Sequence, residues 1–410
     1  MSDDQSNPGP DSGPLNDTVS AGDDVVAAPQ GFGERLSNSF GAILMGLVLI
    51  PLSCWGLFWN EGRAIKTARA LDEGKSIVRS IGTERVDTAL NGQLVHVAGP
   101  TKSAAGVADA DLGVKAPGLK LARHVEMYQW TESESGSGQD RKFTYSREWK
   151  SSAVESGRFR APAGHENPAF PAYRSREFGA ADAKIGAFPV GSAAVSKLGS
   201  MEEFPISNAG LQTAQRVTGR PTQISGGGYY VGTNPGQPRV GDIRVTYKIV
   251  KEGPASFVGR QEADGLQVYR AKNGQQFMLA GLGVQSSDEL FATAHEENRV
   301  LTWILRGVGL LFLFIGFSSL FAPVNLLASY IPILGSLVSG AVTIVAAAAT
   351  AIVGPLVIAI AWFAYRPLLS VAVLAVGIGF AFLFRQWRIK RQQALQARQP
   401  QGGLFIPGSR

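Results

Sequence analysis

Two long stretches of this chain contain no Asp, Glu, Lys or Arg, and they constrain its fold more than any other feature. One covers residues 37–60 and the other covers residues 307–365. A helix needs about 20 predominantly apolar residues to cross the hydrocarbon core of a bilayer, so both stretches are long enough to span a membrane. The sequence therefore predicts an integral membrane protein, with the polar residues 61–306 lying between two membrane anchors.

These stretches divide into four transmembrane helices, one before the polar region and three after it. The first, residues 37–60, is too long for the core of a signal peptide and ends in a bulky run around Trp55 and Trp59, which favours an uncleaved anchor. Pro323 and Pro332 interrupt the second stretch. The expected later elements are a helix over residues 301–321, an uncharged Pro-containing connection over residues 322–335, and helices over residues 336–363 and 368–384.

A basic cluster after the last expected helix sets the orientation. Four Lys and Arg side chains lie within residues 385–391, and the positive-inside rule places them in the cytoplasm. With four spans, both termini are then cytoplasmic, and residues 64–285 form an extracytoplasmic domain in a periplasm or a lumen. Three basic side chains within residues 63–69 favour the opposite orientation for the first helix alone, but the C-terminal cluster is denser.

The two predicted tails differ in charge. Residues 1–33 are acidic and poor in large apolar side chains, so we expect them to be disordered. Residues 385–410 form a basic cytoplasmic tail. The net charge of +6 therefore conceals an uneven distribution. It does not indicate nucleic-acid binding, because residues 64–285 lack a dense Lys/Arg tract with interleaved aromatic residues.

The central region, residues 64–285, is predicted to be a β-rich α+β domain. Residues 243–249 alternate apolar and polar side chains, which is typical of a strand with one buried face. At its end, Ser286 and Glu289 have the spacing of a capping box, which predicts a connecting helix over residues 286–300 that could continue into the next span. Further strands are expected within residues 94–98, 119–130, 143–149, 224–231 and 265–271.

Motifs for catalysis, cofactors or metals are missing from the sequence. The four histidines have no partner three or four residues away, and the string that begins at His295 has Arg299 where a zincin motif requires a second His. Residues 226–228 lack the Lys-Ser/Thr of a phosphate loop, and Cys54 is the single cysteine. We expect no catalytic, cofactor-binding or metal-binding residues, and we interpret these features as a polar helix surface and a turn.

The third expected span, residues 336–363, carries small side chains at intervals of four. This spacing lets helix backbones approach closely. Packing within one protomer is the preferred interpretation, and self-association is the alternative. Pro355 is expected to kink the helix. The small residues form two series: Ser339, Thr343, Ala347 and Ala351, and Ala346, Thr350 and Gly354.

Two opposite charges lie at predicted ends of spans on the same side of the membrane. Glu61 follows the first uncharged stretch, and Arg306 precedes the second. One hypothesis is that they form an ion pair that fixes the first helix against the second. The alternative, which is the more usual arrangement, is that each contacts lipid headgroups or water independently.

Several strings of this chain resemble the transmembrane protein 43 (LUMA) family. The string from Phe58 to Ala64 resembles the signature that follows the first span in that family, and residues 241–245 resemble a later landmark. The resemblance covers roughly residues 32–385 and includes the layout of one span followed by three. The residues that carry it are Trp59, Asn60, Glu61, Gly62, Arg63, Tyr128, Trp130, Trp149, Trp303 and Arg306.

What this resemblance implies is a multi-pass protein without established catalytic residues. Animal members reside in the endoplasmic reticulum and the inner nuclear membrane, self-associate, and interact with lamins and emerin; a bacterial member would reside in the inner membrane. The leading hypothesis is therefore a non-enzymatic homo-oligomer that organises the membrane or envelope with partner proteins. The alternatives are a pore-forming or effector component of a membrane-stress or defence response, and an envelope enzyme.

Overall fold

A computed structural model describes residues 24–27, 32–135, 142–263, 265–328, 334–366 and 385–386. The chain divides into two units. The first is rich in strands and consists chiefly of Val78–Tyr269 and Met278–Leu290. The second is helical and consists of Gly33–Ile77, Arg270–Phe277 and Phe291–Arg410.

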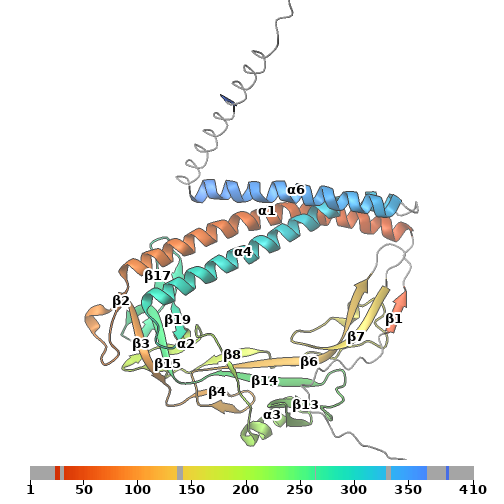
Figure 1. Ribbon diagram of the computed structural model, residues 1–410. Coiled ribbons are helices and arrows are strands. Elements are labelled where there is room, and N and C mark those ends of the chain that lie inside the picture. The colour runs from red at the N-terminus through yellow and green to blue at the C-terminus, as the bar shows by residue number, and fades with distance from the viewer. Residues whose placement is uncertain are drawn as a thin grey trace, which may run out of the picture. The chain divides into compact units, whose positions relative to one another are not determined.

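The larger sheet of the first unit has the strand order β1-β7-β6-β14-β13-β12, and all neighbours in it are antiparallel. Its longest strand, β6, covers Lys120–Ser135 and lies beside β14, Ile243–Val250 (Figure 1). Two short strands pair with these, β8 with β6 and β11 with β14. The remaining bounds are β1 Asp24–Ala27, β7 Lys142–Lys150, β8 Arg176–Gly179, β11 Glu202–Glu203, β12 Thr222–Ser225 and β13 Gly228–Val231.

A second sheet has the order β10-β9-β3-β15-β16, to which β2 and β19 are joined. Two hairpins, β4-β5 and β17-β18, complete the strands that the structure describes. The bounds are β2 Arg79–Ser80, β3 Leu94–Lys102, β4 Val107–Asp109, β5 Val114–Ala116, β9 Lys184–Ile185, β10 Phe188–Pro189, β15 Pro254–Glu262, β16 Gly265–Gln267, β17 Tyr269–Arg270, β18 Gln276–Phe277 and β19 Leu279–Leu282.

The alternating side chains of these strands form the core of the first unit. Ile243, Val245, Tyr247 and Ile249 are buried while the polar residues between them are more exposed, as the period of two predicts. The turn between β12 and β13 contains Gly226 and Gly227, both with positive φ, so it is a hairpin turn. Short helices complete the unit: α2 Gly191–Val195, α3 Leu211–Thr218, and the 3-10 turns Thr88–Leu90, Ser156–Arg158 and Asn208–Gly210.

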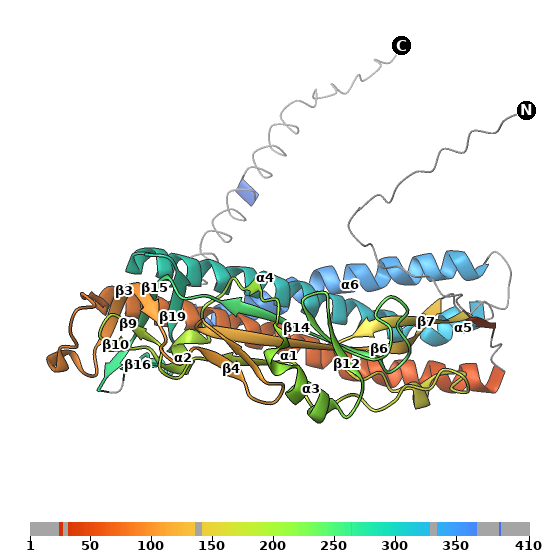
Figure 2. The same ribbon diagram turned by 90° about the horizontal axis from the view of Figure 1, so that it is seen from below.

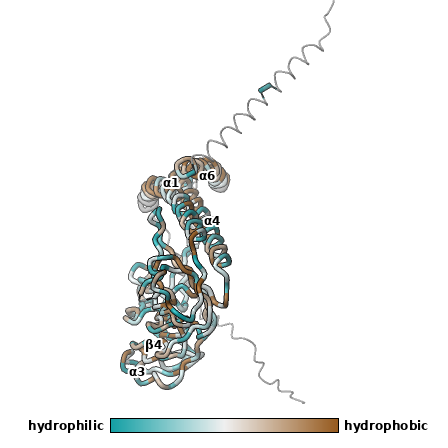
Figure 3. Tube along the Cα trace, turned by 90° about the vertical axis from the view of Figure 1, so that its left-hand side faces the viewer, coloured by the Kyte–Doolittle hydropathy of each residue, from teal (hydrophilic) through white to brown (hydrophobic). Residues whose placement is uncertain are grey.

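The helical unit contains three long helices that run side by side (Figures 1 and 2). They are α1, Phe32–Ile77, α4, Ser287–Leu320, and α6, Leu334–Tyr365, and a short helix, α5, Ala322–Ala328, precedes α6. All three are long and apolar enough to cross a membrane. The first part of α4 contains many hydrophilic residues (Figure 3). By sequence, its uncharged run starts at Gly307.

The structure shows how the expected segments join. The first helix extends beyond the span expected over residues 37–60 and continues to Ile77, because residues 61–77 are mostly helix-forming. The connecting helix expected over residues 286–300 continues into the span expected over residues 301–321, as the sequence allows, and together they form α4, whose start is capped reciprocally by Ser286 and Glu289.

Two further expectations concern the connection and the chain ends. The Pro-containing connection, residues 322–335, contains the helix α5, since Pro323 occupies its first turn, where no backbone donor is needed. Within the expected disordered tail, residues 24–27 instead form β1, which pairs with β7. Its Val-Val pair suits a strand. The fourth expected span, residues 368–384, and the basic tail, residues 385–410, lie outside the described residues except for Arg385 and Gln386.

Candidate functional site

Buried polar side chains gather where α1, α4 and α6 meet, at the ends of their apolar stretches. The central group is the carboxylate of Glu61 on α1. The Arg306 guanidinium of α4 donates from Nε to Oε1 at 2.6 Å and from Nη2 to Oε2 at 2.8 Å. The indole Nε1 of Trp362, on α6, donates to Oε2 at 2.8 Å. One carboxylate therefore joins three helices, and the structure brings the predicted pair Glu61 and Arg306 together.

Because Glu61 and Arg306 are both largely buried, each side chain depends on the other as its counter-charge. The Glu61 side chain is only 2% exposed, and that of Arg306 is 14% exposed. A buried charge is tolerated when its partners supply good geometry and hydrogen bonds, and a bidentate Arg–carboxylate pair meets this requirement. Arg306 also lies over the ring of Trp303, with Cζ 4.6 Å from the ring centroid.

A second set of polar contacts lies one helical turn away and joins α1 to α4. Arg63 donates to the side-chain oxygens of Asn298 and Thr302, both at 3.0 Å, and to Asn60 at 3.2 Å. Asn60 donates to the Thr302 carbonyl at 3.1 Å, and Asn298 donates to the Ala64 carbonyl at 3.0 Å. We call these contacting side chains the polar clamp: Asn60, Glu61, Arg63, Asn298, Thr302, Arg306 and Trp362.

Gly62, in the string from Phe58 to Ala64 that resembles the family signature, has a packing role. A Cβ on Gly62 would lie 2.5 Å from the ring of Tyr365 on α6, so a side chain there would displace that ring. Arg69 donates to the Tyr365 carbonyl at 2.8 Å, and Phe58 contacts the same ring at a centroid distance of 5.4 Å. The end of α6 is therefore held against α1 on both sides of the clamp.

Small residues let the helices approach beyond the clamp. A Cβ on Gly46 of α1 would lie 2.6 Å from the carbonyl oxygen of Gly316 on α4, and one on Gly354 of α6 would clash with the side chain of Leu310. The predicted series Ala346, Thr350 and Gly354 thus packs within the protomer, with Ala346 and Gly354 buried. The other predicted series is exposed: Ser339, Thr343, Ala347 and Ala351.

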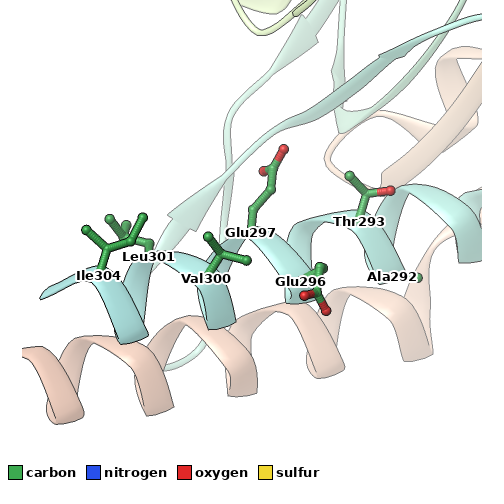
Figure 4. Close-up of a pocket in the computed structure, with 7 residues that line it drawn as sticks. All are labelled: Ala292, Thr293, Glu296, Glu297, Val300, Leu301 and Ile304. Atoms are coloured by element: carbon green, nitrogen blue, oxygen red, sulfur yellow. The ribbon is translucent and has the colours of Figure 1, made fainter. Parts of the chain in front are cut away.

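A groove of about 560 Å³ opens beside the polar clamp. Its lining includes the carboxylate of Glu61 and the rings of Trp303 and Trp362, together with three arginines, Arg299, Arg306 and Arg366. A second hollow lies along α4 alone, with Thr293, Glu296 and Glu297 at one end and Val300, Leu301 and Ile304 at the other (Figure 4). Because one helix lines it, this hollow cannot enclose a substrate.

The signature residues of the first unit form a cluster on the larger sheet. Tyr128 and Trp149 are cross-strand neighbours with ring centroids 5.3 Å apart, and Arg244 covers the Trp149 ring at 4.6 Å. Trp130 packs edge-on against His165 at 4.7 Å. The contacts of Tyr128, Trp149 and Arg244 therefore hold neighbouring strands of this sheet together.

The signature at residues 241–245 has its own structural role. Asp242 is buried, and its side chain accepts hydrogen bonds from the Tyr230 hydroxyl at 2.6 Å and the Arg239 backbone at 2.9 Å. Burial and the bond to Asp242 raise the pKa of Tyr230 well above its usual range. Gly241 adopts a φ of 94°, which favours glycine.

The histidines lie in different parts of the described structure. His96 is buried between the Ser80 hydroxyl and the Gln285 carbonyl, each 3.0 Å from a ring nitrogen. His295 pairs with Asp72 at 3.2 Å on the helix surface. Across the part of the chain that the structure describes, no three His, Cys, Asp or Glu side chains gather in a way that could hold a metal ion.

Sequence reasoning offered the ion pair as one hypothesis beside the favoured alternative of independent contacts with lipid or water, and it missed the contributions of Asn298, Thr302 and Trp362. The first two precede Arg306 at intervals of four residues, which places all three on one face of α4. A polar stripe that faces the charged end of α1 is the signal that could have found them. Trp362 carried no comparable signal, because it lies in an apolar run.

These features define a class: a multi-pass membrane protein in which a β-rich unit is flanked in sequence by long apolar helices joined through buried polar contacts. Comparison with known proteins identifies the family. The family model described as Transmembrane protein 43 matches residues 127–367, and this chain belongs to that family.

Relatives match along most of their length. Transmembrane protein 43 of Rattus norvegicus is 34% identical over 364 residues, which cover 84% of this chain and 90% of the relative. The Homo sapiens protein is 31% identical over 372 residues, with 86% and 92% covered. The Drosophila melanogaster homolog is 28% identical over 365 residues, with 84% and 94% covered. No solved structure matches the chain.

Proposed function

We propose that this protein is a non-enzymatic organiser of its membrane, acting through self-association and binding of other membrane proteins. The observation that carries the proposal is that the two series of small residues on α6 have different surroundings. Its series Ala346, Thr350 and Gly354 is used for packing inside the protomer, whereas the parallel series that contains Thr343 and Ala347 remains exposed. An exposed small-residue series suits close approach of a second helix.

The proposal extends to topology and partners. The β-rich unit lies outside the cytoplasm with both termini inside, in an endoplasmic reticulum or inner nuclear membrane for a eukaryotic chain and in the inner membrane for a bacterial one. Its partners are a second copy and other envelope proteins. The basic side chains within residues 385–391 support this orientation.

Energy transfer between labelled copies tests the self-association. Full-length protein reconstituted at rising protein-to-lipid ratios is expected to show transfer that increases and then saturates. The variant Ala347→Leu/Ala351→Leu, which enlarges the exposed series, should reduce it, and Ile344→Leu/Ile352→Leu on the same helix is the matched control. Equal transfer in both variants would contradict the proposed face.

Ion flux through the same liposomes separates the organiser from a pore-forming component. We expect a tight membrane at protein densities at which transfer between copies has saturated, because no charged side chain lies within residues 307–365. Sustained ion flux under these conditions would favour the pore-forming function over the organising function.

A further inference from the structure

The strand β7 lies near one edge of the larger sheet and is fully paired on one side only (Figure 1). It pairs with β6 along its whole length, from Lys142 to Lys150. On its other side, β1 pairs with only its first four residues, 142–145. No other strand of the described chain pairs with β7, so residues 146–150 form an open edge. The backbone groups of such an edge can pair with a further extended segment.

The strand β1 shows what this edge accepts. It is a four-residue extended segment in antiparallel register, with Asp24 opposite Tyr145 and Ala27 opposite Lys142. No turn joins it to β7, because α1 and the strands β2–β6 lie between them in the chain. Strand addition of this kind gains its affinity from main-chain hydrogen bonds. The edge therefore accepts a segment that is not its neighbour in sequence.

In the topology proposed above, on which this inference rests, β1 cannot remain on the edge. The helix α1 begins on the cytoplasmic side, and only five residue steps separate Ala27 from Phe32. Such a connection spans at most about 17 Å, less than the hydrocarbon core of about 30 Å. β1 then lies in the cytoplasm while β7 lies outside it. In a protomer whose α1 crosses the bilayer, the edge of β7 is open along its whole length.

Charge indicates which kind of segment fits the open edge. The nine residues of β7 include three basic side chains and one acidic side chain, so the difference is two positive charges. Lys150 pairs with Glu148 at 2.6 Å, and the excess comes from Lys142 and from Arg147, which lies over the Trp130 ring at 5.1 Å. By sequence, the segment that occupies the edge carries two negative charges at residues 23–24. The edge is therefore complementary to an acidic segment.

We propose that the open edge of β7 binds an acidic extended segment of another protein, by strand addition on the extracytoplasmic side of the membrane. Main-chain hydrogen bonds hold the segment antiparallel to β7, as they hold β1, and its carboxylates complement the positive excess of the strand. This assigns a chemistry to the envelope partner that the organising function requires, and it places the contact on the β-rich unit.

A labelled peptide that copies residues 21–30 tests the edge on full-length protein in nanodiscs of neutral lipid. Fluorescence anisotropy is expected to show saturable binding. Lys142→Gln should weaken it about two- to fivefold, the range for losing one exposed charge contact. The matched control is Lys115→Gln, on the exposed face of β5, which should bind the peptide as the unchanged protein does. Equal weakening in both variants would overturn the proposal.

Methylation of the peptide backbone separates strand addition from simple attraction between charges. Alternate residues of an edge strand direct their amide groups to opposite sides, so only one set of amides faces β7. One peptide is N-methylated at Val25 and Ala27, and the other at Asp24 and Val26, with charge unchanged. One of them should lose binding while the other keeps most of it. Equal binding of the two peptides would exclude strand addition.

Energy transfer between labelled copies shows whether a second copy occupies the edge instead. The peptide is expected to leave this transfer unchanged, because the self-association proposed above uses the exposed series of α6. A decrease in transfer as the peptide binds would assign the edge to a second copy and overturn the proposal of a different partner.

Thiol labelling separates failure of the docking edge from failure of the topology. Asp24→Cys and Lys115→Cys, each in a Cys54→Ser background, should react with an impermeant reagent from opposite sides of sealed vesicles. Reaction from the same side would leave β1 on the edge and overturn the topology together with this proposal. Opposite sides without peptide binding would overturn the docking edge alone.

Discussion

At the scale of single residues, Glu61 is the carboxylate that joins all three helices of the clamp. Glu61→Gln would place an amide NH2 group against the donors of Arg306 and Trp362, and leave a guanidinium without its counter-charge. We expect the variant to lose about 3–5 kcal/mol of stability, the range for breaking a buried ion pair. Intrinsic-fluorescence unfolding in detergent measures this loss.

The matched control for that measurement is Glu297→Gln, on the exposed surface of α4. Its melting temperature should remain near that of the unchanged protein, because exposed charges contribute little. In the double variant Glu61→Gln/Arg306→Gln, the loss should be smaller than the sum of the two single losses. Additive losses would show that the two side chains do not act as a pair.

His96 gives the first unit a predicted dependence on pH. Burial lowers the pKa of its imidazole, so the folded state favours the neutral ring, whereas the unfolded chain protonates near the ordinary value of about 6.5. The unfolded state therefore binds more protons as pH falls below that value, and stability is lost.

We accordingly expect a lower melting temperature of the full chain at pH 5.5 than at pH 7.5, in buffers of matched ionic strength. His96→Gln should show a smaller difference between the two pH values. His124→Gln, which alters an exposed histidine, should keep the full difference. A difference that is unaffected by either variant would assign the pH dependence to other groups.

At the scale of elements, the two series of small residues on α6 have opposite surroundings. Gly354→Leu should destabilise the helical unit strongly, because its added side chain meets Leu310 and Leu313 of α4. Ala351→Leu, three residues earlier on the exposed series, should leave the melting temperature in detergent nearly unchanged. Equal effects of the two variants would contradict the observed packing of α6.

The elements also show which features the sequence can predict. The alternation in residues 243–249 depends on burial of one sheet face, so it predicts β14 well. The sequence did not predict the end of α1 at Ile77, 17 residues beyond the expected end of the span at Asn60, because a change from apolar to amphipathic residues ends a membrane span without ending the helix. The contact of Trp362 with Glu61 depends on how the helices cross. The local sequence pattern does not specify this crossing.

At the scale of the whole molecule, family membership and the two kinds of unit are accessible from the sequence. The strings that resemble the family occur along this chain in the same order as in the family, and the family match extends over residues 127–367. The sequence offers the ion pair of Glu61 and Arg306 only as one hypothesis, because charges at the ends of spans can also contact lipid headgroups or water independently. The rest of the clamp requires coordinates, since its amide and hydroxyl groups form hydrogen bonds equally well with water.

The separation in sequence of the clamp residues has a consequence for biogenesis. Glu61 precedes Arg306 by 245 residues and Trp362 by 301 residues. At a synthesis rate of about 5–20 residues per second, the carboxylate waits about 12–50 seconds for its first counter-charge. During that interval the first helix is already made while its permanent partners do not yet exist. The contacts by which Glu61 joins α1 to α4 and α6 can therefore be complete only after α6 has been synthesised.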